Sequence, residues 1–151
     1  MEELYTTWKA IGVAGGDLSF FQDFFVKFYQ AFIEGDRWLQ YLNGVKTTLL
    51  VTALALILGI VLGVLVAMLR TAHDQQRPGH RNPILAVLNL ICKVYVTVIR
   101  GTPMMVQLLI MGFVIFASSR NFTMIGTLTL GINSGAYVSE IVRGGLMSVD
   151  K

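Results

Sequence analysis

The stretch TLLVTALALILGIVLGVLVAML, residues 48–69, contains no charged side chain and ends at Arg70. At about 1.5 Å of rise per residue, a helix over these residues reaches across a hydrocarbon core of about 30 Å. A soluble helix of this length without one charge is rare, so the stretch predicts a membrane span. Gly59 and Gly63 form a GxxxG pair inside it, which permits the close approach of a second helix.

The composition of the whole chain agrees with a membrane protein. Of its 151 residues, 54% are hydrophobic and 14% charged, whereas soluble domains carry about 25% charged residues. The net charge of +3 comes from dispersed basic residues and not from a basic stripe, so a nucleic-acid partner is not expected. Cys92 is the single cysteine, and His73 and His80 have no companion ligands, so no metal site is expected. No paired catalytic residues, HExxH motif or glycine-rich phosphate loop occurs, so the chain is not expected to be an enzyme.

Residues 1–40 are predicted to form an extracytoplasmic or interfacial segment with an amphipathic helix. Phenylalanines recur at helical spacing from Phe20 to Phe32, while Asp23 and Lys27 fall on another face. Ser19 with Gln22 fits a capping box at the start of this helix. Such a helix can lie in the lipid headgroup layer or pack against a partner, and the sequence leaves both open.

Residues 41–151 are predicted to be an all-α membrane region with spans at about 48–69, 102–119 and 122–142. Asn82 followed by Pro83 predicts a helix start, and residues 84–99 either lie along the membrane surface or run into the next span. Arginines are concentrated in the 70–82 loop, which the positive-inside rule places in the cytoplasm. The N-terminus and the turn at Arg120 are then outside, and the C-terminal end is cytoplasmic.

Polar side chains within the predicted spans are the candidates for a substrate path. They are Gln107, Asn133, Ser134 and Glu140. Polar groups are costly in lipid and normally face a bundle interior or a water-filled path. For Glu140 two interpretations stand: it contributes to the translocation path, or it is an interfacial carboxylate paired with Arg143 by i,i+3 spacing.

Three blocks now permit a comparison with a known family. They are GVKTTLLVTALALILGIVLGVLVAMLR at 44–70, YVTVIRGTPMMVQ at 95–107 and GINSGAYVSEIVRGGLMSVDK at 131–151. In content, order and spacing they resemble the permease subunits of polar amino-acid ABC importers of the histidine, glutamine and arginine type, which have a MetI-like transmembrane domain. The resemblance covers roughly residues 41–151.

The resemblance implies the positions that carry the family's motifs in this chain. Arg100, Thr102, Pro103 and Gln107 occupy the RGTP-x-x-x-Q positions, and Gly135, Ala136, Tyr137, Glu140, Arg143 and Gly144 occupy the GAY-x-x-E-x-x-R-G positions. Pro103 removes a backbone donor and sets the direction in which the second span begins. Small residues such as Gly131 and Gly135 allow helices to approach closely.

The resemblance also implies the fold and the partners. The chain would supply the first three helical spans of a five-span, dimer-forming permease subunit in a bacterial cytoplasmic membrane. ABC ATPase subunits, an extracytoplasmic solute-binding protein and a second permease subunit, identical or different, would be its partners. The chain itself would bind no cofactor, since the ATPase would use the ATP and Mg.

One departure from the family concerns the end of the chain. In the family a cytoplasmic loop with a Glu-Ala-Ala signature docks on the ATPase and two further spans follow, whereas this chain stops at Lys151. The expectation is a permease truncated before its coupling loop. The alternative is an inactive or truncated small membrane protein with a structural or assembly role.

Overall fold

The computed structural model describes residues 1–76 and 82–149, and every regular element among them is a helix, which confirms the predicted all-α class. The protein divides into two compact units, Met1–Thr47 and Thr48–Lys151. This boundary lies later than the predicted one at residue 40, because the long helix α3 (Arg37–Asp74) begins inside the first unit. Residues 77–81 of the predicted cytoplasmic loop, and residues 150–151 of the predicted cytoplasmic end, lie outside the described residues.

The first unit is held together by aromatic packing between α1 (Glu2–Val13) and α2 (Phe20–Phe32). The rings of Tyr5 and Tyr29 stack with centroids 4.2 Å apart, and Trp8 meets Phe25 edge-on at 5.4 Å. At the start of α2 the backbone N–H of Ser19 donates to Gln22 Oε1 at 2.9 Å, as the capping-box pattern predicted. Sequence reasoning found α2 but not α1.

A left-handed turn ends α2 and leads into α3. Gly35 and Asp36, in the short 3₁₀ segment Glu34–Asp36, have φ of 65° and 55°, a region that favours glycine. Beside the turn Lys9 forms an ion pair with Glu34. The hydrogen bond to Glu34 raises the pKa of Lys9 above 10.5, and the same bond lowers the pKa of Glu34 below 4.5. The pair therefore joins α1 to the turn over the whole intermediate pH range.

Two helices among the described residues are long and apolar enough to cross a membrane, Glu34–Asp74 and Pro83–Gly101. The first contains the charge-free stretch 48–69. The second, α4 (Pro83–Gly101), begins as predicted, with Asn82 Oδ1 accepting from the backbone N–H of Ile84 at 3.0 Å. Because α4 is one continuous helix that ends before Pro103, residues 84–99 do not run into the next helix.

The structure differs from the predicted span at 102–119. These residues form the short helix α5 (Met104–Ile110), a π-helical turn (Met111–Ile115) and a non-helical end. The apolar helical part, Met104–Ile115, would cover about 18 Å at ~1.5 Å per residue, too short for a core of ~30 Å. A new helix begins after Pro103, as the predicted span does, but the helical part ends at Ile115 and does not continue to residue 119.

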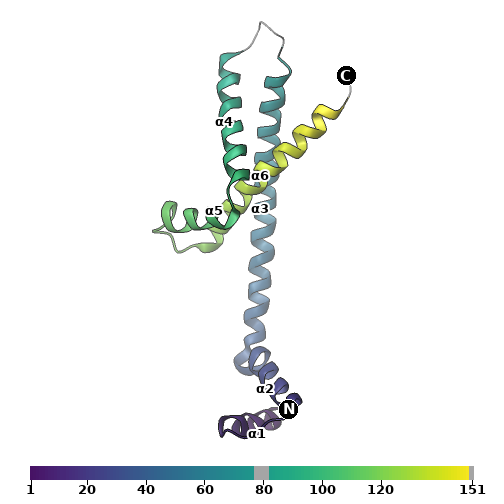
Figure 1. Ribbon diagram of the computed structural model, residues 1–151, viewed down its shortest axis with the longest axis vertical. Helices are drawn as coiled ribbons and strands as arrows, with labels where there is room; N and C mark the ends of the chain where they lie inside the picture. The colour runs from purple at the N-terminus through teal and green to yellow at the C-terminus, as the bar shows by residue number, and fades with distance from the viewer. Residues whose placement is uncertain (77–81, 150–151) are drawn as a thin grey trace. The chain divides into compact units, whose positions relative to one another are not determined.

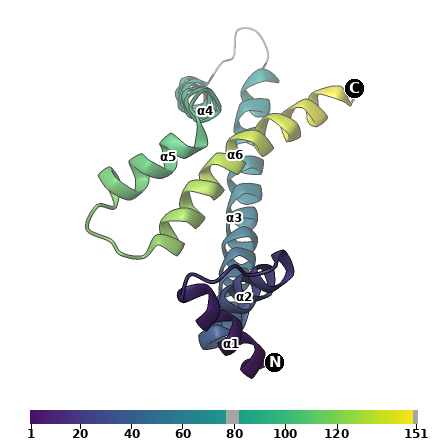
Figure 2. The same ribbon diagram turned by 60° about the horizontal axis from the view of Figure 1, so that its bottom comes forward.

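The last helix, α6 (Phe122–Ser148), contains the predicted span 122–142 and continues past it. Asn121 Oδ1 caps its first turn by accepting from Met124 N–H at 3.0 Å. Within the second unit α6 crosses the Thr48–Asp74 part of α3 (Figure 1), and α5 and α6 form a helical hairpin (Figure 2). Most large apolar side chains of α3 and α4 are exposed, as expected for surfaces that face lipid.

Candidate functional site: a broken helix and its amide contacts

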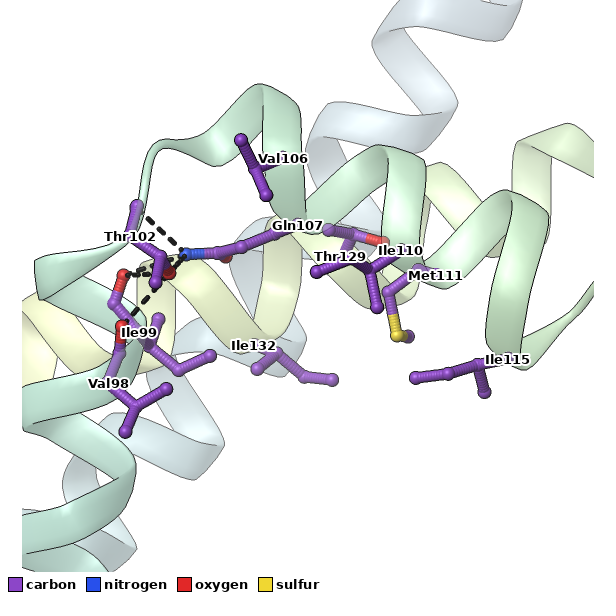
Figure 3. Close-up of a pocket in the computed structure, with 10 residues that line it drawn as sticks. All are labelled: Val98, Ile99, Thr102, Val106, Gln107, Ile110, Met111, Ile115, Thr129 and Ile132. Carbon is purple, nitrogen blue, oxygen red and sulfur yellow. Dashed lines mark hydrogen bonds between the residues drawn. The ribbon is translucent and has the colours of Figure 1, made fainter.

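The break between α4 and α5 is closed by the side chain of Gln107. The last carbonyls of a helix have no partners within the helix, and Pro103 has no N–H to offer. Gln107 Nε2 donates to the carbonyl oxygens of Ile99 at 2.7 Å and Thr102 at 3.1 Å, and to Thr102 Oγ1 at 2.7 Å (Figure 3). The Thr102 hydroxyl in turn donates to the Val98 carbonyl at 2.9 Å. A side-chain amide thus replaces the backbone donors that the break removes.

A second amide connects this break to α6. Asn133 Nδ2 donates to Gln107 Oε1 at 3.1 Å, so both ends of the Gln107 amide are engaged. Gln107 is buried, with 8% of its surface exposed. The structure therefore brings together two of the four predicted path residues, and uses Gln107 as a link between three helices.

Beside the Gln107 amide lies a pocket of about 230 Å³ between α4, α5 and α6. Its walls are mostly the aliphatic side chains drawn in Figure 3, and its polar members are Thr102, Gln107 and Thr129. The Thr129 hydroxyl donates to the carbonyl of Ile125 within its own helix at 2.7 Å. Since each of these polar groups already has a partner within the chain, the pocket wall is apolar in character.

The two sequence motifs meet in space. The guanidinium of Arg100, from the RGTP block, lies 5.2 Å from the ring centroid of Tyr137, from the GAY block. This distance is within the range of a cation–π contact. The hydroxyl of Tyr95 also joins α4 to α6, donating to the Ile132 carbonyl at 2.6 Å. Tyr95 opens the sequence block 95–107, but no role was predicted for it.

The four glycines predicted to support helix packing lie where α6 crosses α3. A Cβ on Gly59 would lie 2.7 Å from Ser134 Cβ, and one on Gly131 would lie 2.5 Å from Leu58 Cδ2. A Cβ on Gly135 would come within 3.0 Å of both Leu62 and the Tyr95 hydroxyl. Ser134, a predicted path residue, therefore packs against Gly59. Ala136 is fully buried, whereas a Cβ on Gly144 would meet open space.

Glu140 lies in a cluster of charges that joins the end of α3 to α6. Glu140 Oε1 forms an ion pair with Arg70, and Glu140 Oε2 lies 3.8 Å from Arg143 Nη2. Arg143 Nη1 also contacts Asp74 Oδ2 at 3.1 Å. The side chains of Arg70 and Glu140 are 12% and 26% exposed, so the pair is largely shielded from solvent. The predicted i,i+3 pair is present, but Arg70 and Asp74 were not anticipated.

The sequence suggested that His73 lies in a loop, but in the structure it lies in the last turn of α3, at the same end as the charge cluster. Its Nδ1 lies 3.1 Å from Asn89 Nδ2 of α4, which ties the three helices together at one end. No group of three or more metal-ligating side chains occurs in the part of the chain that the structure describes. The contacts of the cluster are ion pairs between α3 and α6 and a hydrogen bond between α3 and α4.

No protein-family model matches the chain. It is 36% identical over 113 residues to a putative glutamine transport system permease protein of Rickettsia prowazekii, covering 73% of this chain and 47% of the relative. It is 38% identical over 72 residues to the glutamine transport system permease protein of Escherichia coli K12, covering 43% of this chain and 32% of that protein. The chain spans about half the length of the curated relatives it matches first.

Solved structures point the same way. The fold matches a crystal structure of an amino acid ABC transporter with histidines, with a TM-score of 0.58 and 32% identity over 89% of this chain and 53% of that one. The chain is an all-α integral membrane protein. By sequence and fold it is similar, over about half of their length, to permease proteins of amino-acid ABC transporters.

Proposed function

We propose that the protein acts in the permease subunit of an ATP-binding-cassette importer, where it forms part of the path for polar amino-acid uptake across a bacterial cytoplasmic membrane. The observation that carries the proposal is the agreement of sequence and fold with amino-acid transporter permeases over most of the chain. The helices long and apolar enough to span a membrane support it. Glutamine, which the names of the relatives mention, is the substrate to test first.

The partners follow from this role. ATP hydrolysis would take place in separate ABC ATPase subunits, which would use ATP and Mg, because the relatives are named as the permease proteins of transport systems. An extracytoplasmic solute-binding protein would deliver the amino acid. A second permease subunit, identical or different, would complete the path by covering surfaces that this chain leaves exposed.

The proposed orientation puts the N-terminus outside and both the 70–82 loop and the C-terminal end in the cytoplasm. Two observations support it: the arginines of that loop, and the contact between Arg143 and Asp74, which places the end of α6 beside the start of the loop. In a Cys92→Ala background, a cysteine at Gln76 should react with an impermeant thiol reagent only from the cytoplasmic side. A cysteine at Asn121 should react only from outside, and the reverse pattern would overturn the orientation.

Uptake tests the function directly. The full-length gene product, expressed with its ATPase and binding protein in a strain without glutamine uptake, should restore accumulation of labelled glutamine. Competition by unlabelled histidine, arginine and cystine would define the range of substrates. A variant ATPase that cannot hydrolyse ATP is the control and should abolish uptake. If neither labelled glutamine nor, in parallel assays, labelled histidine, arginine or cystine accumulates with all subunits present in the membrane, only a structural or assembly role would remain.

A further inference from the structure

The helix α2 has three distinct faces, and one of them is left largely exposed by the rest of the first unit. Phe25, Val26 and Tyr29 face α1, where Tyr29 stacks on Tyr5. Asp23 and Lys27 form an exposed i,i+4 ion pair with a 2.7 Å contact on a second side. The third side is a row of exposed phenylalanines: Phe20, Phe21, Phe24, Phe28 and Phe32.

This phenylalanine face is too apolar to be left in water. Its five phenylalanines are between 43% and 79% exposed. Neighbours along the row contact each other: the ring centroids of Phe24 and Phe28 lie 6.3 Å apart, and those of Phe28 and Phe32 lie 4.9 Å apart. α1 does not cover them, because it packs on the adjacent side of the helix. Contiguous apolar patches of this kind mark surfaces that meet a protein or a membrane.

The chain itself indicates which of the two meets this face. Phe32, at the end of the row, packs against Tyr41 of α3 with ring centroids 5.1 Å apart. Thr48, where the charge-free stretch begins, is only seven positions after Tyr41, about 10 Å of helix at ~1.5 Å per residue. Trp38 and Tyr41 are the residue types that gather at the membrane–water interface. Along the chain, the end of the row is thus followed closely by aromatic residues suited to the interface and then by the start of the charge-free stretch.

We propose that the phenylalanine face of α2 inserts into the lipid headgroup layer where α3 enters the membrane, so that the first unit is an interfacial anchor. The occupant is the bilayer itself and not a protein partner. The unit 1–47 carries four basic and six acidic residues, a net charge of −2. Its binding to lipid is therefore driven by apolar burial and is not strengthened by anionic headgroups.

Two positions on α2 distinguish the faces. Phe28 lies in the middle of the phenylalanine row, and Asp23 lies about 140° away around the helix at 3.6 residues per turn. Both residues are substantially exposed, so a label should not disrupt the packing of α1 on α2. Phe28→Cys and Asp23→Cys, each made in the Cys92→Ala background of the full-length protein, form a matched pair for nitroxide spin labelling.

The test is spin-label accessibility in nanodiscs of phosphatidylethanolamine and phosphatidylglycerol. At Phe28 collisions with oxygen should exceed those with a water-soluble nickel complex, which is the signature of lipid, and at Asp23 the ratio should be reversed. Replacing the phosphatidylglycerol with phosphatidylcholine should leave both ratios unchanged. High nickel accessibility at both positions would show that the face lies in water. Shielding of Phe28 from both reagents would show that protein covers it, and either result would overturn the proposal.

Discussion

Helix α6 is held on its two sides in different ways. Toward α3 the contact is made through Gly59, Gly63, Gly131 and Gly135, and both helices are unbroken. Toward α4 and α5 it is made through hydrogen bonds of Tyr95 and Asn133, beside a helix broken at Pro103. The difference follows from the backbone. An unbroken helix satisfies its own polar groups and can associate by shape alone, whereas a broken one in lipid must borrow donors from side chains.

The two contacts should therefore fail for different reasons. The glycine crossing has no room for a side chain, so it is sensitive to added volume. The broken helix has few donors, so it is sensitive to the loss of an amide even when the volume is kept. Two kinds of substitution separate these cases. One adds a single methyl group to a glycine, and the other replaces an amide by an aliphatic group of similar volume.

The largest effect is expected at Gly63. A Cβ at this position would lie 2.5 Å from Val138 Cγ1, 2.6 Å from Val138 Cβ and 3.0 Å from the Gly135 carbonyl oxygen. Val138 is β-branched and stiff, so the helices have to separate. Gly63→Ala should lower the free energy of unfolding by about 3 kcal/mol, the upper end of the usual cost of overpacking. The measurement is an SDS titration of the full-length protein in mixed micelles.

Gly126→Ala is the matched control for this substitution. Gly126 also lies in a long apolar helix, α6, but nothing lies within 4 Å of the position its Cβ would take. Its replacement should leave the unfolding midpoint unchanged or raise it slightly, because alanine favours helix. Equal losses from Gly63→Ala and Gly126→Ala would mean that the crossing does not depend on the close approach at Gly63.

An intermediate effect is expected at Gln107. Gln107→Leu keeps most of the volume but removes the donor to the carbonyls of Ile99 and Thr102 and the acceptor for Asn133. Leaving buried polar groups unsatisfied should cost about 2 kcal/mol in the same titration. Thr102→Ser keeps the hydroxyl that bonds to Gln107 and should cost far less. If Gln107→Leu is as stable as the parent protein, the amide does not hold the break closed.

The smallest effect is expected at Glu140. Substitutions there test whether the ion pair between α3 and α6 contributes to uptake. In the full-length protein Glu140→Gln should lower uptake by roughly tenfold, or ~1.4 kcal/mol in a rate-determining step. The structure provides a test of the reason, because Glu140 pairs with Arg70 of α3. The charge exchange Arg70→Glu with Glu140→Arg should restore most of the uptake if the ion pair is what matters. No recovery, at matched membrane levels, would assign the Glu140 carboxylate to the translocation path.

Local signals along the sequence predicted several elements well. The charge-free stretch 48–69 lies inside α3, Asn82 and Pro83 begin α4, and Ser19 with Gln22 begins α2. The start of a helix after Pro103 was predicted as well, but its end at Ile115 was not, because hydropathy does not show where an uncharged helix stops. Asn89 and Lys93 also lowered the apolar character of α4, so the sequence suggested a surface helix as readily as a span.

The sequence selected polar residues that make contacts in the structure, but it did not predict most of their partners. Gln107, Asn133, Ser134 and Glu140 were selected because polar groups are costly in lipid, and all four make contacts between helices or across the helix break. Asn133 and Glu140 each have a partner far along the chain, 26 residues away for Asn133 and 70 for Glu140. No periodicity of 3.6 residues reaches that far, so Arg70, Asp74 and Tyr95 could not be found.

The sequence by itself determined that this chain is a helical membrane protein with transporter-permease motifs, where its main apolar helix runs, and that small residues mark a helix contact. Those properties depend on the transfer of side chains to lipid and on local capping, which act within a few residues. Only the tertiary structure decided that Gly63 meets Val138, that Gln107 closes the break after α4, and that Glu140 pairs with Arg70. Those contacts depend on where two helices cross, and the crossing point is set by the packing of both helices at once.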